Sequence, residues 1–183
     1  KMGVSRTPIR EAIRMLEQEG LAVTIPRKGA QVAGMTEKDM EDSLEIRAAL
    51  DELAVQLACD AITEEQLKQL KIAMRSFEEA IRTKDIKKIA EADVVFHDTI
   101  YKATGNEKLV SMLNNLREQV YRYRVEYLKE DKSYPILIQE HEELYKGIVR
   151  KDKAYVSEVM KKHVQNQVNA VKSIIREQKE KLV

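Results

Sequence analysis

The sequence predicts a mainly α protein in two parts: a short, turn-rich N-terminal segment, then an antiparallel bundle of helices. The 183-residue chain has four of its six glycines and two of its three prolines within residues 1–34. Such residues punctuate tight turns. In the remainder, apolar residues recur at three- and four-residue spacing, which is typical of helices. The change in composition places the domain boundary between residues 1–34 and residues 35–183.

The composition excludes several classes of protein. Hydrophobic residues make up 43% of the chain, and 32 Lys and Arg residues balance 31 Asp and Glu residues. Because Cys59 is the only cysteine, neither an intrachain disulfide nor a cysteine-based zinc module can form. The apolar runs are too short to span a bilayer, and no signal peptide is seen. We therefore expect a soluble cytoplasmic protein that does not contact a membrane.

The N-terminal segment has a net positive charge, whereas the remainder of the chain has a small net negative charge. Residues 1–34 hold six basic and three acidic side chains, whereas the rest of the chain holds 26 basic and 28 acidic ones. Ser5 is placed to cap a helix, Pro8 suits its first turn, and Gly20 is placed to end it. An apolar stripe follows one side of this helix: Ile9, Ala12, Ile13 and Leu16. Three arginines recur every four residues away from that stripe: Arg6, Arg10 and Arg14.

A short hairpin with a basic tip is expected next. Apolar residues alternate over residues 21–25, the sequence Pro-Arg-Lys-Gly at residues 26–29 turns the chain, and residues 30–32 return. A helix followed by such a hairpin is the winged form of a helix-turn-helix, in which the helix enters the major groove of DNA. A surface helix followed by an unrelated hairpin fits the pattern equally well.

A longer string favours the winged helix. The sequence GVSRTPIREA at residues 3–12, with LEQEGL at 16–21 and PRKG at 26–29, closely resembles the recognition helix and wing of GntR-family bacterial transcription regulators. Arginine suits such a role because its guanidinium pairs with guanine or phosphate. The first helix and most of the second helix of that domain are missing, so we expect a partial winged helix-turn-helix. The resemblance implies DNA contacts from Ser5, Arg6, Thr7, Arg10 and Gly29.

Six helices are predicted in the remainder of the chain. Thr36, residues 63–66 (Thr-Glu-Glu-Gln) and Asp85 are N-terminal signals, and Gly105 is a C-terminal one. Such helices with short connections predict an antiparallel bundle. The expected helices span about residues 37–60, 63–83, 85–103, 106–129, 134–150 and 152–179.

The three histidines of the chain are spaced so that they can meet. Asp93 and His97 are four residues apart and share a helix face. His141 lies ten residues before Lys151 and His163 twelve after it, so an antiparallel hairpin places both at the same height. Three imidazoles and one carboxylate suit zinc, nickel or manganese, with open positions for a ligand. Three unrelated structural histidines are the alternative.

The same residues carry a second resemblance. The sequences DVVFH at residues 93–97, ATGN at 103–106, EH at 140–141 and KH at 162–163 look like the FCD effector domain of the FadR subfamily of GntR regulators. That domain is an all-helical bundle, and many members bind a metal through one Asp and three His. In that subfamily the metal commonly helps to hold a small carboxylate or sugar acid. The resemblance implies a divalent metal ion held by Asp93, His97, His141 and His163.

Two arginines are candidates for binding such an effector. Arg47 lies beside an apolar stripe in the first bundle helix, where the family often has an arginine. Arg124 continues the apolar line of the fourth helix. Surface arginines with only their aliphatic part packed are the alternative for both residues.

Three functions fit these features. The first is a ligand-responsive transcription regulator, a repressor that acts as a homodimer and whose effector changes the spacing of two heads on operator DNA. The second is a metal-dependent hydrolase or isomerase, because an open metal site can activate water. The sequence HEELY at residues 141–145 is not, however, the metalloprotease pattern HExxH. The third is a metabolite-binding bundle that acts without DNA. The regulator alone accounts for both parts of the chain, so we do not expect an enzyme.

Overall fold

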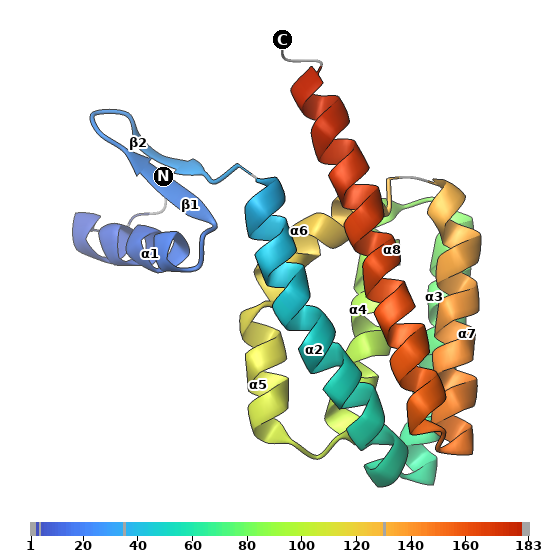
Figure 1. The fold of residues 1–183 in the computed structure, drawn as a ribbon. Helices are drawn as coiled ribbons and strands as arrows, with labels where there is room; N and C mark the ends of the chain where they lie inside the picture. The colour runs from blue at the N-terminus through green and yellow to red at the C-terminus, as the bar shows by residue number, and fades with distance from the viewer. Residues whose placement is uncertain (1–2, 4, 35, 130, 181–183) are drawn as a thin grey trace. The chain divides into compact units, whose positions relative to one another are not determined.

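The computed structural model describes residues 3, 5–34, 36–129 and 131–180 (Figure 1). The chain divides into two compact units after Thr36, two residues beyond the boundary that the composition predicts. In the part of the chain that is described, no helix combines the length and the apolar character needed to cross a membrane.

The first unit contains one helix and a hairpin. Its elements are α1 (Arg6–Gln18), β1 (Ala22–Ile25) and β2 (Gly29–Val32). The strands are antiparallel, with Ala22 opposite Val32. In the turn between them, the Lys28 amide donates to the Ile25 carbonyl oxygen at 3.0 Å. Proline at position 26 and a positive φ of 67° at Arg27 are both typical of a type II turn. The helix and the hairpin with its basic turn are therefore as predicted.

The apolar stripe of α1 is largely exposed. No α1 residue is fully buried, and the side chains of Ile9 and Leu16 are 42% and 43% exposed. The Thr24 amide donates to the Glu17 carboxylate at 2.6 Å, which ties the last turn of α1 to β1. Ser5 occupies the N-cap position, but its side chain makes no capping hydrogen bond.

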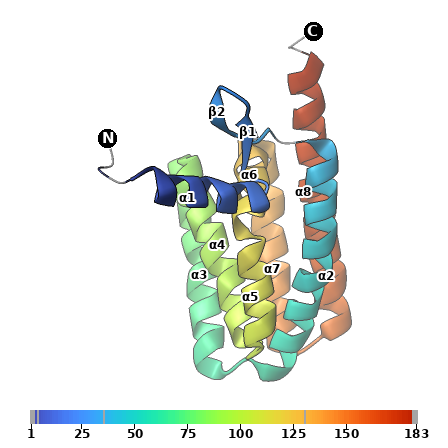
Figure 2. The ribbon, with the colours of Figure 1, turned by 90° about the vertical axis from the view of Figure 1, so that its left-hand side faces the viewer.

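The second unit is a helical bundle. Helices α2, α3, α4, α7 and α8 run side by side along its length (Figures 1 and 2). The helices are α2 (Glu37–Ala61), α3 (Glu64–Thr83), α4 (Ile86–Ala103), α5 (Glu107–Asn115), α6 (Arg117–Tyr127), α7 (Tyr134–Arg150) and α8 (Lys153–Glu180), with a 3-10 turn at Asp131–Ser133. This antiparallel arrangement confirms the predicted fold class.

Side-chain caps fix where several helices begin. Thr63 and Gln66 form a capping box, in which the Gln66 amide donates to the Thr63 hydroxyl at 3.2 Å and the Thr63 amide donates to the Gln66 side chain at 3.0 Å. The Asp85 carboxylate accepts from two amides in the first turn of α4. The Asn106 side chain accepts from the Leu109 amide at 3.1 Å. These residues are the helix starts that the sequence predicts.

The predicted single helix over residues 106–129 is wrong, because the structure breaks it at Leu116 into α5 and α6. Helix α5 buries Leu109 and Leu113, whereas α6 packs against α2, α4 and α8. Both halves contact α2 and α4, and α6 in addition packs against α8. Residues 114–115 are both asparagine, a weak helix former, so the break costs little there.

A close approach of α7 to α8 brings two of the histidine-bearing helices together. Gly147 on α7 faces α8 so closely that an added Cβ would lie 2.9 Å from a Tyr155 ring carbon. Both helices contribute to a core that includes Leu144, Val156 and the buried Cys59. This core fixes the positions of α7 and α8 relative to each other, next to His141 and His163.

Candidate metal centre

Three buried histidines meet in the middle of the bundle. His97 comes from α4, His141 from α7 and His163 from α8, and each is at most 1% exposed. Ligand nitrogens of the three rings lie within 4.8 Å of one another. Their ring centroids are 5.2 to 5.7 Å apart. The spacing argument from the sequence therefore places these side chains correctly.

Asp93 lies against two of these rings. Its Oδ1 atom is 3.2 Å from His141 Nε2 and 3.8 Å from His97 Nε2. Its Oδ2 atom is 2.5 Å from Arg124 Nε. All four side chains predicted as metal ligands are thus in one cluster, in which Asp93 also contacts a guanidinium.

Most polar atoms of this cluster lack a hydrogen bond. Both carboxylate oxygens of Asp93 and both ring nitrogens of His97 and His141 are buried without a partner in hydrogen-bonding geometry, although they are close to one another. Each unsatisfied buried polar group costs about 1–3 kcal/mol, so such groups are rare in native proteins. One nitrogen of each imidazole and the Oδ1 atom of Asp93 lie close together, and ligands of these types fit a divalent transition metal.

Electrostatics set the protonation states of the cluster. Burial lowers the pKa of His97 and of His141 by more than the Asp93 carboxylate raises it, so both rings are neutral at neutral pH. Burial acts to raise the pKa of Asp93, but Arg124 and the imidazoles outweigh it and hold that pKa well below its ordinary value. Neutral imidazoles and an ionised carboxylate are the forms that bind metal.

His163 differs from the other two histidines because both of its ring nitrogens have a neighbour. Its Nδ1 atom lies 2.7 Å from Glu140 Oε2, and its Nε2 atom lies 3.0 Å from the side-chain nitrogen of Gln167. The Asn166 side chain donates to Glu140 Oε1 at 2.6 Å. Burial acts to raise the pKa of Glu140, but the hydrogen bond from His163 and its other neighbours lower it below its ordinary value. Glu140 is therefore a buried, ionised acceptor.

Two phenylalanines pack against the histidine cluster. Phe96 stacks on the His141 ring at 4.1 Å, and Phe77 packs against the same ring at 4.4 Å. Both are fully buried. They hold the ring in one orientation and keep water away from it.

The two arginines predicted to bind an effector lie beside the histidines. Arg47 and Arg124 are each 5% exposed, so neither is a surface arginine. They line a cavity of about 10 Å³, which has room for about one water molecule. The lining includes charged, phenolic and imidazole groups: Arg47, His97, Asp98, Tyr101, Arg117 and Arg124.

Each arginine of this cavity contacts an aspartate. Arg47 Nε donates to Asp51 at 2.9 Å, and Tyr101 joins the pair through hydrogen bonds of 2.6 Å to both partners. Arg117 donates to Asp98 at 2.7 Å, and Arg124 contacts Asp93 at 2.5 Å. Tyr101 and Arg117 are not among the candidates predicted from the sequence, because no motif distinguishes them from other residues of their type. The arginine charges are thus balanced within the site.

The candidate DNA-binding residues lie in the first unit. Arg6, Thr7 and Arg10 are exposed on the first turns of α1, directly after Ser5. Gly29 opens β2 at a φ of 88°, a value that glycine adopts readily, next to the basic turn.

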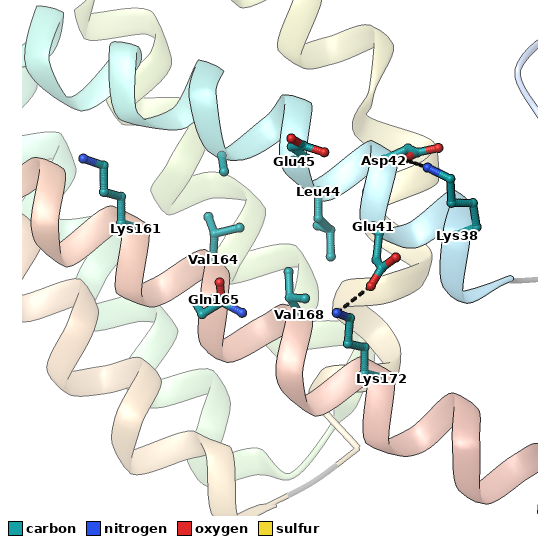
Figure 3. A pocket seen from close by; sticks show the side chains of 11 residues that line it. Lys38, Glu41, Asp42, Leu44, Glu45, Lys161, Val164, Gln165, Val168 and Lys172 are labelled. Carbon is teal, nitrogen blue, oxygen red and sulfur yellow. Dashed lines mark hydrogen bonds and ion pairs between the residues drawn. The ribbon is translucent and has the colours of Figure 1, made fainter.

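A larger hollow lies elsewhere, between α2 and α8 (Figure 3). It has a volume of about 620 Å³ and an apolar floor that includes Leu44, Val164 and Val168. Lys172 of α8 pairs with Glu41 of α2 across the hollow at 2.5 Å, and Lys38 pairs with Asp42 along α2 at 2.5 Å. It contains none of the clustered histidines, so it is not part of the candidate metal centre.

Comparison with known protein families defines the class of protein as a bacterial transcription regulator. The FCD domain model matches residues 42–166, and the model of bacterial regulatory proteins of the gntR family matches residues 1–32. The chain therefore belongs to the GntR family and carries an FCD domain. Regulators of this family bind operator DNA.

Individual relatives agree with this assignment. The chain is 29% identical to the HTH-type transcriptional regulator YdhC of Bacillus subtilis (strain 168), over 97% of this chain and 80% of that protein. It is 26% identical to the gluconate operon transcriptional repressor of Bacillus licheniformis, over 84% of this chain and 65% of the repressor. The fold matches the solved structure of E. coli McbR/YncC with a TM-score of 0.82 and 19% identity, over 94% of this chain and 87% of that one.

The buried Arg47–Asp51 pair generates a prediction about stability. Replacing Asp51 with Ala leaves the Arg47 charge buried beside Tyr101 alone, so we expect the free energy of unfolding to fall by about 3–5 kcal/mol. Urea denaturation followed by circular dichroism measures this. Asp42→Ala is the matched control, because Lys38–Asp42 is also an i,i+4 pair on α2 but is solvent-exposed. Equal losses in the two variants would contradict the role given to the buried pair.

Proposed function

We propose that this chain is a metabolite-responsive repressor that holds one divalent metal ion through Asp93, His97, His141 and His163. The observation that carries the proposal is the buried cluster in which one nitrogen of each of three imidazoles and the Oδ1 atom of Asp93 lie close together, with the nitrogens of His97 and His141 and this oxygen lacking a hydrogen bond. Without a cation, such a cluster would be a large local cost in stability. A metal of the zinc, nickel or manganese type would bind one nitrogen of each ring and the Oδ1 atom of Asp93.

The bound metal would supply positive charge and open coordination positions for carboxylate oxygens. The chain's own residues would then place the effector. Arg47 and Arg124 line the cavity beside His97, and their guanidinium groups are suited to bind a carboxylate. One relative represses a gluconate operon, and gluconate is a sugar acid. We infer a small carboxylate or sugar acid as the effector.

The size of the cavity suggests how binding is transmitted. A space of about 10 Å³ cannot hold a molecule of several heavy atoms unless its lining moves. The lining joins α4 to α6 through Asp98–Arg117 and Asp93–Arg124. An effector that enters would displace parts of this lining, and we infer that α4 and α6 shift relative to each other. In a homodimer, such a shift would change the spacing of the two DNA-binding heads.

The N-terminal unit would bind operator DNA. Arg6 and Arg10 would contact bases and phosphates from α1, with Ser5 and Thr7 beside them, and Gly29 would let the wing approach the backbone. The excess of positive charge in residues 1–34 supports this role.

Metal analysis tests the proposed site. We expect about one zinc, nickel or manganese ion per purified chain, measured by plasma mass spectrometry, and a loss of affinity above about 100-fold in His141→Ala and Asp93→Asn, because each removes a ligand. Asp98→Asn, on the same helix but outside the cluster, should retain the metal. A wild-type chain without stoichiometric metal, even after incubation with each ion, would overturn the proposal.

A thermal-shift screen tests the effector. Small carboxylates and sugar acids are added to the metal-loaded chain and to chelator-treated chain, and a ligand at 100 times its Kd should stabilise the loaded chain by about 2.7 kcal/mol. We expect no shift after chelation and none in Arg124→Gln, whereas Arg75→Gln, an exposed arginine of α3, should respond like wild type. A carboxylate that stabilises the chelated and loaded forms equally would contradict the proposed binding mode.

DNA binding is tested with the full-length protein and with DNA from upstream of its own operon. Arg10→Ala removes a base or phosphate contact from α1, so we expect binding to weaken by about 1–3 kcal/mol in an anisotropy titration at fixed salt. Arg75→Ala changes the net charge equally but lies in the bundle, and it should bind like wild type. Absence of salt-dependent binding to any upstream DNA would rule out the regulator.

A further inference from the structure

We propose that Glu140 is a positioning residue of the metal site, which fixes the tautomer and orientation of His163, and that Gln167 occupies the metal-binding nitrogen of His163 until a metal displaces it. This inference rests on the proposed metal site. It concerns two residues outside the set of four ligands, one on α7 and one on α8.

Both carboxylate oxygens of Glu140 have a hydrogen-bonding partner on α8. The carboxylate is 2% exposed, and its Oε2 atom is 2.7 Å from His163 Nδ1. Its Oε1 atom accepts a hydrogen bond from Asn166, one turn of α8 away from the site. Two partners on α8 therefore hold a side chain of α7 in a single position.

This geometry determines which ring nitrogen of His163 carries the proton. A carboxylate oxygen accepts hydrogen bonds, so the Nδ1 atom of His163 must donate, and in a neutral ring the lone pair then lies on Nε2. Metal-binding histidines commonly donate their second nitrogen to a carboxylate in this way, which fixes the ring and makes the ligating nitrogen more basic. Glu140 thus leaves Nε2 of His163 free to act as a ligand.

Gln167 completes the arrangement from the other side of the ring. Its side-chain nitrogen lies 3.0 Å from His163 Nε2, and it is 7% exposed, four residues after His163 on α8. Because Nε2 carries the lone pair, the Gln167 amide donates to it. A metal at the centre of the three histidines needs that same lone pair, so Gln167 and the metal compete for one atom.

The two residues therefore have opposite effects on metal affinity. Glu140 favours binding, and its loss should weaken it, typically by about 10- to 100-fold for such a hydrogen-bonded carboxylate. Gln167 opposes binding, and removing one hydrogen bond of ordinary strength should tighten it by about 2- to 10-fold. A residue that merely supports the fold would not produce this difference in sign.

The test is a competition titration of the full chain with zinc and a chromophoric chelator. The variants are Glu140→Gln, Gln167→Ala, and Glu142→Gln as the matched control, since Glu142 lies on the same helix but pairs with Lys146 at 2.7 Å. We expect weaker binding in Glu140→Gln, tighter binding in Gln167→Ala, and wild-type binding in Glu142→Gln. Thermal unfolding of each metal-free variant checks that it folds.

A second measurement needs no metal. With only three histidines in the chain, ¹⁵N-histidine labelling gives three ring systems in a long-range ¹H–¹⁵N spectrum. The signals that His163→Gln removes identify His163. We expect the Nδ1-protonated tautomer in metal-free wild type, and a shift towards the Nε2-protonated form in Glu140→Ala.

The outcomes separate the two proposals. If wild type binds no zinc, the metal site itself fails. If wild type binds zinc and His163→Gln loses it, but Glu140→Gln binds like wild type, the positioning role is wrong while the metal site stands. An Nε2-protonated His163 in metal-free wild type, or weaker zinc binding in Gln167→Ala, would also overturn the inference.

Discussion

A carboxylate buried among imidazoles and a guanidinium is the interaction on which the bundle's chemistry depends. Asp93 is 1% exposed, and its two oxygens face His141 and His97 on one side and Arg124 on the other. Burying a charge is costly unless it is paired. One side chain therefore contacts both regions: Oδ1 faces the histidine cluster, and Oδ2 pairs with Arg124 of the adjoining cavity.

Packed aromatic rings surround this arrangement on one side, and ion pairs surround it on the other. Helices α7 and α8 approach closely at Gly147, and Phe96 and Phe77 clamp His141. Helix α6 is short, is separated from α5 at Leu116 and buries Val120, Tyr123 and Tyr127, but its contacts with α4 beside the cavity are ion pairs. Ion pairs can exchange partners with an incoming carboxylate, whereas packed aromatic rings cannot. We infer that α6 is the element that responds to the effector.

Much of the fold and of the site follows from the sequence, because the number of residues between two side chains determines their relative height and face on a helix. The rise per residue places His141 and His163 at one height, and the four-residue interval places Asp93 and His97 on one face. The break at Leu116 has no glycine or proline to mark it and depends on tertiary packing. The contact of Arg47 with Tyr101, 54 residues away, and the closed cavity likewise depend on how helices pack, which spacing along the chain does not encode.

Anomalous X-ray diffraction from crystals of the zinc-loaded chain, recorded above and below the zinc edge, tests the central claim most directly. The account predicts one peak per chain in the bundle, about 2.0–2.2 Å from a ring nitrogen of His97, His141 and His163 and from a carboxylate oxygen of Asp93. Zinc bound only at other residues, with these four side chains hydrogen-bonded among themselves, would contradict it.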